Sequence, residues 1–460
     1  MRFFFKTFRL FLVLLVFASC KKEENYYYDA ENPLSFSDDT VKFDTVFTTL
    51  GSTTRRVKIF NRSKDDITIS KIELAGGSHS SYQININGIA ANSLSNFKIR
   101  GRDSINLFVR VNIDPTVEET PFIVADSIHF FTDGKQQKLQ LQAFGQNARF
   151  VRGVTITSNT VWDKTLPYVV YDSVKVAEGK VLTLLKGTRV YFHKGAGLIV
   201  AGTLNVQGEF KDSVTMASDR KERIYSEVPG QWEGIHFLKS SKDNVINNAM
   251  IKNALVGIKV DSVSVNANPK VVIANSIVKN MEVAGMLGYN TSIAGFNNLF
   301  ANCGKYLIYC NNGGDYNFKQ NTFVNFFSFS ARITPSLFFS DYVSASSTSA
   351  FKLSLINNII WGNQADELIV EKKGNDFTQL IRTNLIRSKD KNLASSGNII
   401  NSEPLFVDVS KYDFRLLSSS PAVNVGENLN SEPSFSNWLS KDRKGKERVF
   451  PSELGCYEIF

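Results

Sequence analysis

The hydrophobic pattern divides the chain into two parts with different strand lengths. Between residues 36 and 147, apolar and polar side chains alternate over segments such as RRVKIFN from Arg55, ITISKIEL from Ile67 and KLQLQAF from Lys138. Alternation with a period of two predicts strands that bury one face, and no helical period competes with it. A run of such strands separated by turn residues predicts a β-sandwich over residues 36–147.

From about residue 150 the apolar segments become shorter and glycines separate them. The stretch GKVLTLLKGTRVYFHKGAGLIVAGTLNVQGEF from Gly179 is typical of this part of the chain. Segments this short are below the usual strand length of a sandwich, but they fit the faces of a solenoid coil.

An asparagine-rich phrase then repeats between Asn248 and Ser388. It begins at residues 248, 275, 297, 320, 357 and 383, so the intervals are 27, 22, 23, 37 and 26 by subtraction. Most of these intervals match one turn of a parallel β-solenoid. Each phrase places an apolar pair in the core, with an asparagine on either side where the backbone can adopt left-handed conformations. Asparagine amides that stack and hydrogen-bond between coils would hold these turns.

Several motifs within residues 150–460 narrow the type of solenoid. GQWEGIHF from Gly230, NNIIWGN from Asn357, SPAVNVG from Ser420 and LGCYE from Leu454 follow one another in this order. They resemble right-handed parallel β-helix proteins of the pectate-lyase-like superfamily and their C-terminal closing segment. Residues 36–147 resemble the immunoglobulin-like domains found beside bacterial surface modules. The resemblance implies an all-β chain: an immunoglobulin-like β-sandwich followed by a right-handed parallel β-helix over residues 150–460.

Residues 1–19 have the three parts of an export signal: basic residues, the apolar run LFLVLLVF, and small residues before Cys20. FASC at this position resembles a bacterial lipobox, which implies cleavage before Cys20 and lipid attachment to its sulfur and amine. Residues 20–35 would then form a lipidated tether. Anchoring by several acyl chains is expected to hold the protein permanently on a membrane. An ordinary secretory peptide with a chance cysteine is the alternative.

KKEE directly after Cys20 is similar to the sequence that sends lipoproteins of the Bacteroidetes group to the outer face of the outer membrane. We therefore expect an outer-membrane lipoprotein that faces the cell exterior. A charged tether without sorting function would look the same.

Charge and cysteine content exclude other classes of function. The formal net charge of +9 includes three basic residues of the signal, and the remaining lysines and arginines form no dense cluster. This argues against a nucleic-acid partner. The cysteines after Cys20 are Cys303, Cys310 and Cys456, too few for a disulfide scaffold. Whether Cys303 and Cys310 form a buried thiol pair or a disulfide is left open by the sequence.

The sequence provides no catalytic constellation. A glycoside hydrolase needs two nearby carboxylates, but between Asn248 and Phe326 the acids are Asp261, Glu282 and Asp315, at offsets 13, 7 and 18 from their repeat starts. A lyase needs a cation or several donors beside a base, and the same stretch has lysines but neither arginine nor an acidic cluster for calcium. The histidines lack metal-binding spacing. No catalytic residue, metal or cofactor is predicted.

The repeat interval of 37 exceeds its neighbours, and the excess falls between Ser328 and Ala350. Insertions in a solenoid leave the stack at one face and often bind ligands. The predicted ligand-binding residues, which combine aromatic and polar side chains, are Arg332, Phe338, Phe339, Asp341 and Tyr342. In the alternative interpretation, this segment is a loop whose phenylalanines pack against the coil.

The sequence thus favours a non-catalytic surface lipoprotein that binds an extracellular polysaccharide or another surface protein through its β-helix face. A polysaccharide lyase or glycoside hydrolase of a glycan-uptake system is one alternative. A structural or adhesive envelope protein is another.

Overall fold

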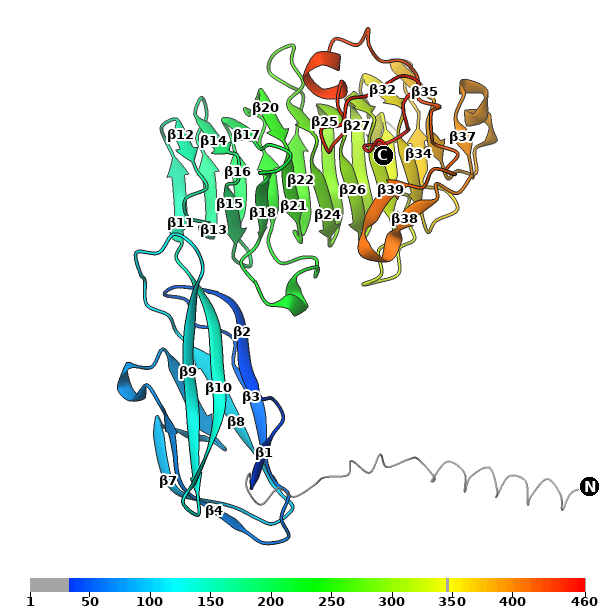
Figure 1. Ribbon diagram of the computed structural model, residues 1–460. Helices are drawn as coiled ribbons and strands as arrows, with labels where there is room; N and C mark the ends of the chain where they lie inside the picture. Colours follow the sequence, from blue (N-terminus) through cyan, green and yellow to red (C-terminus); the bar gives the residue numbers. More distant parts are fainter. Residues whose placement is uncertain (1–32, 345–346, 460) are drawn as a thin grey trace, which may run out of the picture. The chain divides into compact units, whose positions relative to one another are not determined.

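The computed structural model describes residues 33–344 and 347–459, which form two compact units (Figure 1). The first unit contains residues 33–114 and 123–145, and the second contains residues 115–122 and 146–459. The expected signal, the expected lipid-attachment residue Cys20 and most of the expected tether lie outside the described residues.

The first unit is built from two five-stranded sheets, with strand orders β1-β3-β8-β5-β6 and β2-β10-β9-β4-β7. Their inner faces meet in aromatic contacts such as Phe36 with Phe130 and Phe43 with Tyr82. The alternating residues therefore form the predicted sandwich core. The strands are β1 Leu34–Phe36, β2 Thr40–Phe47, β3 Arg55–Asn61, β4 Ile67–Leu74, β5 Tyr82–Ile86, β6 Ile89–Ala90, β7 Ser93–Ile99, β8 Ser104–Val111, β9 Phe122–Thr132 and β10 Lys135–Gln146.

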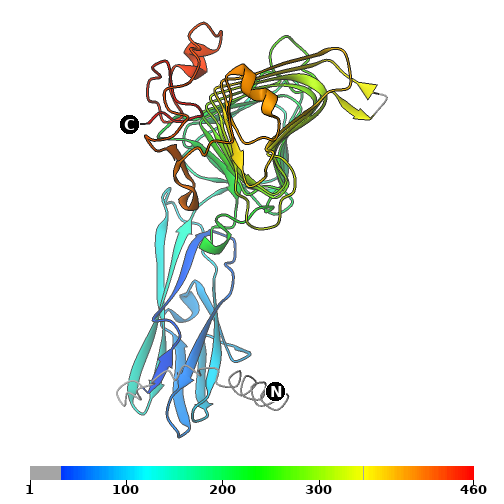
Figure 2. The same ribbon diagram turned by 90° about the vertical axis from the view of Figure 1, so that its right-hand side faces the viewer.

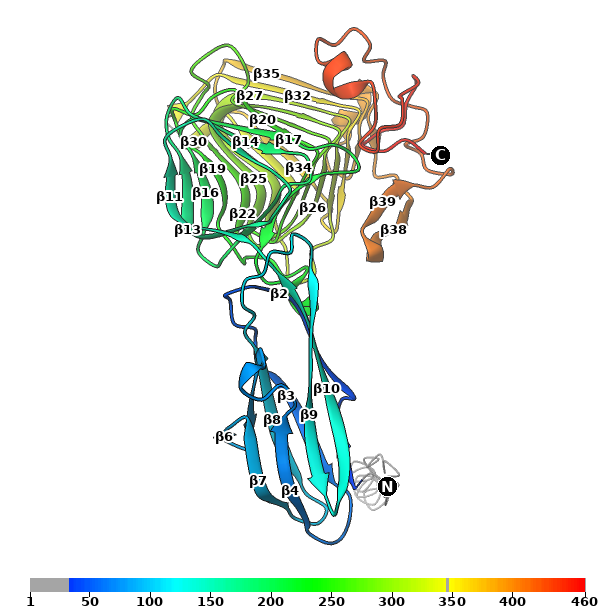
Figure 3. The same cartoon turned by 60° about the vertical axis from the view of Figure 1, so that its left-hand side comes forward.

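The second unit is a solenoid in which 25 strands form one continuous sheet. Strands of successive coils pair in parallel and run side by side (Figure 3). Three faces result, because each coil contributes one segment to each face. Long strands bend and contribute to two of them. A β-helix fold, predicted from the asparagine phrase, is thereby confirmed.

The faces are named here by their strands. Face 1 contains the start of β13 (Tyr168–Val176), β15 Arg189–Phe192, β18 Val214–Ser218, β21 Ala249–Lys252, β24 Ile277–Met281, β26 Leu299–Cys303, β28 Thr322–Asn325, β33 Ile359–Gly362, β36 Leu385–Ile386 and β37 Ile399–Ile400. Face 2 contains the end of β13, β16 Gly197–Val200, β19 Gly234–Phe237, β22 Val256–Asp261, the first halves of β25 (Ala284–Phe296) and β27 (Tyr306–Lys319), β29 Leu337–Ser340 and β34 Leu368–Glu371.

Face 3 contains β12 Thr160–Trp162, β14 Val181–Leu185, β17 Thr203–Gln207, β20 Asn244–Asn247, β23 Val271–Ala274, the second halves of β25 and β27, β32 Phe351–Ile356 and β35 Phe377–Arg382. The remaining strands are β11 Arg149–Ile156, which pairs with β13 at the first coil, the hairpin β30 Tyr342–Ser344 with β31 Ser347–Thr348, and the pair β38 Phe406–Asp408 with β39 Asp413–Leu416.

Asparagine shapes the turn between face 3 and face 1. The residue that opens each repeat has a positive φ, including Asn248, Asn275 and Asn297, and Gln320 and Thr383 adopt the same conformation in later coils. The side chains of the following residues form a buried ladder: amide nitrogens of Asn298, Asn321, Asn358 and Asn384 donate to the amide oxygen of the next coil at 2.9, 3.0, 2.9 and 2.9 Å, ending at Asn398. The predicted amide stacking is therefore present.

The C-terminal segment, residues 402–459, packs over the outer side of face 1 and the adjoining edge of face 3. Outward-facing Ala301, Val324 and Trp361 are covered by Phe414 and Leu454. A second cluster joins Phe296 and Ile356 to Leu429 and Leu439. This segment, coloured orange to red, lies on one side of the coils in Figure 2. Faces 2 and 3 keep outward surfaces that the segment does not cover, so candidate binding surfaces are sought there.

Candidate functional site

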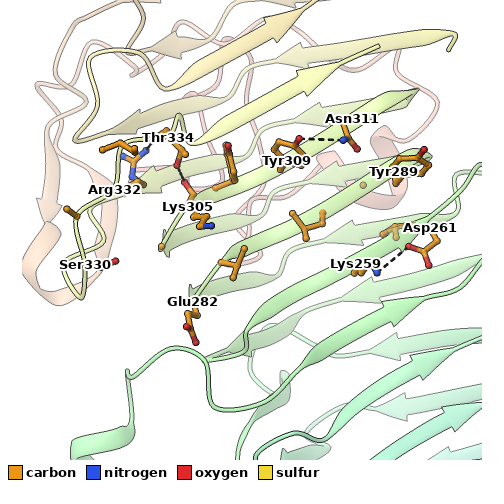
Figure 4. A pocket seen from close by; sticks show the side chains of 18 residues that line it. Lys259, Asp261, Glu282, Tyr289, Lys305, Tyr309, Asn311, Ser330, Arg332 and Thr334 are labelled. Atoms are coloured by element: carbon orange, nitrogen blue, oxygen red, sulfur yellow. Dashed lines mark hydrogen bonds and ion pairs between the residues drawn. The ribbon is translucent and has the colours of Figure 1, made fainter. Parts of the chain in front are cut away.

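A groove of about 950 Å³ crosses face 2 (Figure 4). Its floor comes from β22, β25 and β27, and one wall comes from residues 330–334. It is lined by Lys259, Val260, Asp261, Glu282, Val283, Leu287, Gly288, Tyr289, Gly304, Lys305, Tyr306, Tyr309, Asn311, Ser330, Ala331, Arg332, Ile333 and Thr334. We call it the face-2 groove.

Three aromatic side chains form a platform on face 2, and two of them, Tyr306 and Tyr309, line the groove. Tyr309 and Phe338 are register neighbours on β27 and β29, and their rings stack with centroids 5.0 Å apart at 12°. Tyr306 lies 4.8 Å from Tyr309, and all three side chains are half-buried. Burial raises the pKa of Tyr306, so its hydroxyl stays protonated at neutral pH. The aromatic platform therefore presents ring surface and hydroxyl donors together.

Charged groups stand at both ends of the face-2 groove. Figure 4 places Lys305 and Glu282 at one end, and Asp261 with Tyr289 and Asn311 at the other. Lys259 Nζ lies 3.9 Å from Asp261 Oδ1. Each end thus combines one cation with one carboxylate, so the groove has no strong preference for ligands of either charge.

Asp261, at one end of the groove, also pairs with His236, which does not itself line the groove. His236 is the register neighbour of Lys259, and its Nε2 lies 2.6 Å from Asp261 Oδ2. A carboxylate on one ring nitrogen orients the imidazole and leaves Nδ1 for a further partner. No sequence motif indicates this pair, because Asp261 belongs to the next coil and lies 25 residues further along the chain.

Three of the five predicted ligand-binding residues, Arg332, Phe339 and Asp341, are buried. Arg332 and Glu367 form a buried ion pair in which the guanidinium Nη1 and Nη2 donate to the carboxylate at 2.8 and 2.6 Å. Phe339 is fully buried in the solenoid core. Asp341 is also fully buried, and its carboxylate accepts from the backbone N–H groups of Lys373 and Gly374. Of these three residues, Arg332 alone also lines the face-2 groove.

The other two predicted residues remain accessible. Phe338 belongs to the aromatic platform, and Tyr342 donates its hydroxyl to Glu371 while Lys373 Nζ lies 3.5 Å from the centroid of its ring. The inserted stretch is therefore not one loop outside the stack. Its centre, LFFS, returns to face 2 as β29 because its alternating phenylalanines match a coil strand.

The structure also places the cysteines and the potential metal ligands. Cys303 and Cys310 are free buried thiols, and burial raises the pKa of Cys303 to about 12, so neither is a reactive thiolate. Among the residues that the structure describes, no group of three or more His, Cys, Asp or Glu side chains is placed to hold a metal. No helix within residues 33–344 and 347–459 has the length and apolarity to cross a bilayer.

Comparison with known proteins supports the fold. A family model for the right-handed beta helix region matches residues 141–323. No curated protein matches the sequence significantly. One similar solved structure is a family 123 glycoside hydrolase from Clostridium perfringens, at 10% identity and a TM-score of 0.18, with 25% of each chain covered.

Two further structures are similar over different shares of the chain. PapD-like domain 7 of human CEP192 is similar at 7% identity and a TM-score of 0.19, over 29% of this chain and 98% of that domain. The catalytic unit of a GH87 α-1,3-glucanase from Streptomyces thermodiastaticus is similar at 10% identity and a TM-score of 0.15, over 75% of this chain and 66% of that one. Such weak likenesses carry no functional argument. The parallel strand register and the family match together identify the second unit as a right-handed parallel β-helix.

Proposed function

We propose that this protein is an outer-membrane lipoprotein that binds extracellular glycan through the face-2 groove without cleaving it. The aromatic platform carries the proposal. Half-buried rings of Tyr306, Tyr309 and Phe338 face solvent beside hydrogen-bonding groups, and sugars offer apolar ring faces edged by hydroxyls.

The charge balance of the groove favours glycan over other extracellular polymers. Lysines and carboxylates occur in equal number there, since Lys259 and Lys305 accompany Asp261 and Glu282, while Arg332 is neutralised by Glu367. A strongly anionic or cationic polymer would gain little from such a surface. A polymer recognised by stacking and hydrogen bonds would gain most.

The other parts of the chain have supporting roles in this proposal. Cys20 would carry the lipid anchor, and the two-sheet unit would be an immunoglobulin-like spacer between the membrane and the β-helix. An adhesive envelope component, the third function considered, would bind another surface protein through the same face. It would then show no affinity for soluble glycans.

A lyase activity is the second candidate, and the His236–Asp261 pair is the observation that favours it. The imidazole would take the proton from the carbon next to a uronate carboxylate. The electron pair left behind would form a carbon–carbon double bond as the glycosidic oxygen departs and takes a proton from water. Lys259 would stabilise the carboxylate. Hydrolysis is less favoured, because Asp261 and Glu282 stand at opposite ends of the groove instead of as a close pair.

One experiment separates these functions. The purified protein is incubated with neutral and uronate-containing polysaccharides, and both retention on the polymer and release of unsaturated or reducing ends are measured. We expect retention without release. Tyr309→Ala should weaken retention by roughly tenfold, the equivalent of about 1.4 kcal/mol. Phe210→Ala, an exposed aromatic outside the groove, is the matched control and should leave it unchanged.

Two results would contradict the proposed binding function or its site. Release of unsaturated ends that disappears in His236→Ala would replace the binding function by the lyase. Equal retention of the wild type and Tyr309→Ala on every polymer would refute the face-2 groove as the glycan site.

A further inference from the structure

Face 3 carries a second groove, which was not anticipated from the sequence. Its volume is about 710 Å³, and its two walls are residues 263–269 and residues 432–438 of the C-terminal segment. We call it the face-3 groove. It is separate from the face-2 groove, because the two share no lining residue.

The floor of the face-3 groove is a column of outward side chains in parallel register. Val272 pairs with Ala294, Ala294 with Asn317, and Asn317 with Ser354. Ala294 is buried, whereas Val272, Asn317 and Ser354 are half-buried, so the floor is open at three of these four positions. Rungs of a β-helix are about 4.8 Å apart, so four of them span about 14 Å along the axis. This length suits an extended polymer better than a compact ligand.

Charges along the face-3 groove are already neutralised within the protein. Lys352 Nζ lies 3.5 Å from Asp315 Oδ2, and Lys319 forms an ion pair with Glu432. No net charge is therefore left to attract a polyanion or a polycation. This argues for an uncharged ligand.

Unused hydrogen-bonding groups remain on the floor and rim. The hydroxyls of Ser354 and Thr378 have no partner among the described residues. Because both residues line the groove, a ligand can replace the water that solvates these hydroxyls.

Apolar groups border these polar ones. Leu380 is exposed at the register position next to Ser354, and half-buried Trp438 stands on the opposite wall. We infer that the face-3 groove is a second binding site, for a neutral polysaccharide segment that lies along the solenoid axis. Sugar hydroxyls meet the hydroxyls of Ser354 and Thr378, and the apolar faces of the sugar rings meet Leu380 and Trp438. This inference does not depend on the face-2 groove binding glycan.

Calorimetric titration with neutral gluco-, manno-, galacto- and xylo-oligosaccharides tests the inference on the full-length protein. Ser354→Trp fills the floor and should weaken binding at the face-3 groove by roughly tenfold or more. Thr378→Trp blocks the same groove from an exposed position, in case the first variant misfolds. Asn205→Trp lies in the same outward column but outside the groove, and should bind like the wild type.

Tyr309→Ala is titrated in parallel to separate the two grooves. Binding that survives Tyr309→Ala and is lost in Ser354→Trp and Thr378→Trp supports the face-3 site, whatever happens at face 2. Binding unaffected by both tryptophan variants overturns it. Equal loss in Asn205→Trp, or self-association that both tryptophan variants abolish without any glycan binding, overturns it as well.

Discussion

At the scale of single residues, asparagine contributes to the turn between face 3 and face 1 in two distinct ways. The first residue of each phrase supplies a left-handed backbone, which Gln320 and Thr383 also adopt. The second supplies the buried amide ladder, in which each side chain both donates to and accepts from neighbouring coils. The ladder uses both the nitrogen and the oxygen of each side-chain amide. Its asparagines should therefore tolerate substitution less well than the residues that precede them.

Asn321→Ala should be strongly destabilising. The Asn321 amide donates to the carbonyls of Gly295 and Lys319 and to Asn358, and accepts from Asn298. Its loss leaves several buried groups unsatisfied, so the free energy of unfolding should fall by about 3 kcal/mol in denaturant titrations.

Asn205→Ala is the control for this prediction, because Asn205 points outward and makes no side-chain hydrogen bond in the described structure. It should change the free energy of unfolding by less than about 0.5 kcal/mol. Equal effects of the two substitutions would contradict a stabilising ladder.

Lys270 should produce a measurable pH dependence. Its side chain is buried, and the ammonium donates to the backbone carbonyls of Leu238, Lys239 and Asp261. Burial lowers the pKa of Lys270 to about 8 from 10.5. Between these values the unfolded chain holds a proton that the folded chain has lost, so raising the pH favours the folded state.

To test this, the free energies of unfolding of the wild type and of Lys270→Met are measured from pH 7 to 10.5, and the second is subtracted from the first. This difference should rise above pH 8 and should be flat below it, where both states are protonated. Parallel curves for the two proteins over the whole range would show that Lys270 titrates normally.

At the scale of secondary-structure elements, the outer side of face 2 depends on connections whose lengths vary. The connection from face 1 to face 2 is residues 282–283 and 304–305 in two coils, but residues 326–336 in the next. The asparagine phrases predicted face 1 because each phrase defines its own turn. They could not predict which residues of face 2 would align, because offsets counted from face 1 are shifted by each connection.

The candidate site was predictable only in part for this reason. An aromatic contribution from the insertion was expected, and Phe338 provides it, but its stacking partner Tyr309 lies in an ordinary coil. Arg332 looked like a ligand contact in the sequence, since its partner Glu367 is 35 residues away. Phe339 is buried because it alternates with Phe338 in strand β29. The length of the insertion did not indicate that it contains a coil strand.

The Arg332–Glu367 ion pair should be essential for the wall of the face-2 groove. Glu367 also accepts from the backbone N–H and hydroxyl of Ser336, so one carboxylate holds residues 332–336 against the coil. Glu367→Gln leaves a buried guanidinium uncompensated, and the free energy of unfolding should fall by about 3–5 kcal/mol.

Two comparisons test the role of this pair. Asp315→Asn removes the exposed pair with Lys352 and should cost less than about 1 kcal/mol. The double variant Arg332→Met with Glu367→Leu should recover part of the stability lost in Glu367→Gln, since no isolated charge remains. A Glu367→Gln protein as stable as Asp315→Asn would contradict a structural role for the pair.

At the scale of the whole molecule, the C-terminal segment determines which faces of the solenoid are available for binding. It covers much of face 1 with apolar contacts, whereas faces 2 and 3 each keep a groove. Glycan sites on two faces of one rigid scaffold would raise the effective concentration of a long polymer at the second site once the first is filled. A protein held at a cell surface by lipid would then retain polymers more firmly than short oligosaccharides.

Retention of a polymer at the cell surface would depend on the proposed lipid anchor at Cys20, which lies outside the described residues. Cys20→Ser removes the sulfur that would receive the diacylglycerol, and several acyl chains account for stable membrane attachment. We expect the wild type in the membrane fraction and in the detergent phase after phase separation. The variant should lose the lipid, and N-terminal mass spectrometry should show residues 1–19 still attached. If Cys20→Ser carries the same added acyl mass as the wild type and partitions into detergent equally, Cys20 is not the lipid site. The acyl mass is the decisive measurement, because an uncleaved apolar signal can hold a protein on a membrane but cannot add acyl mass.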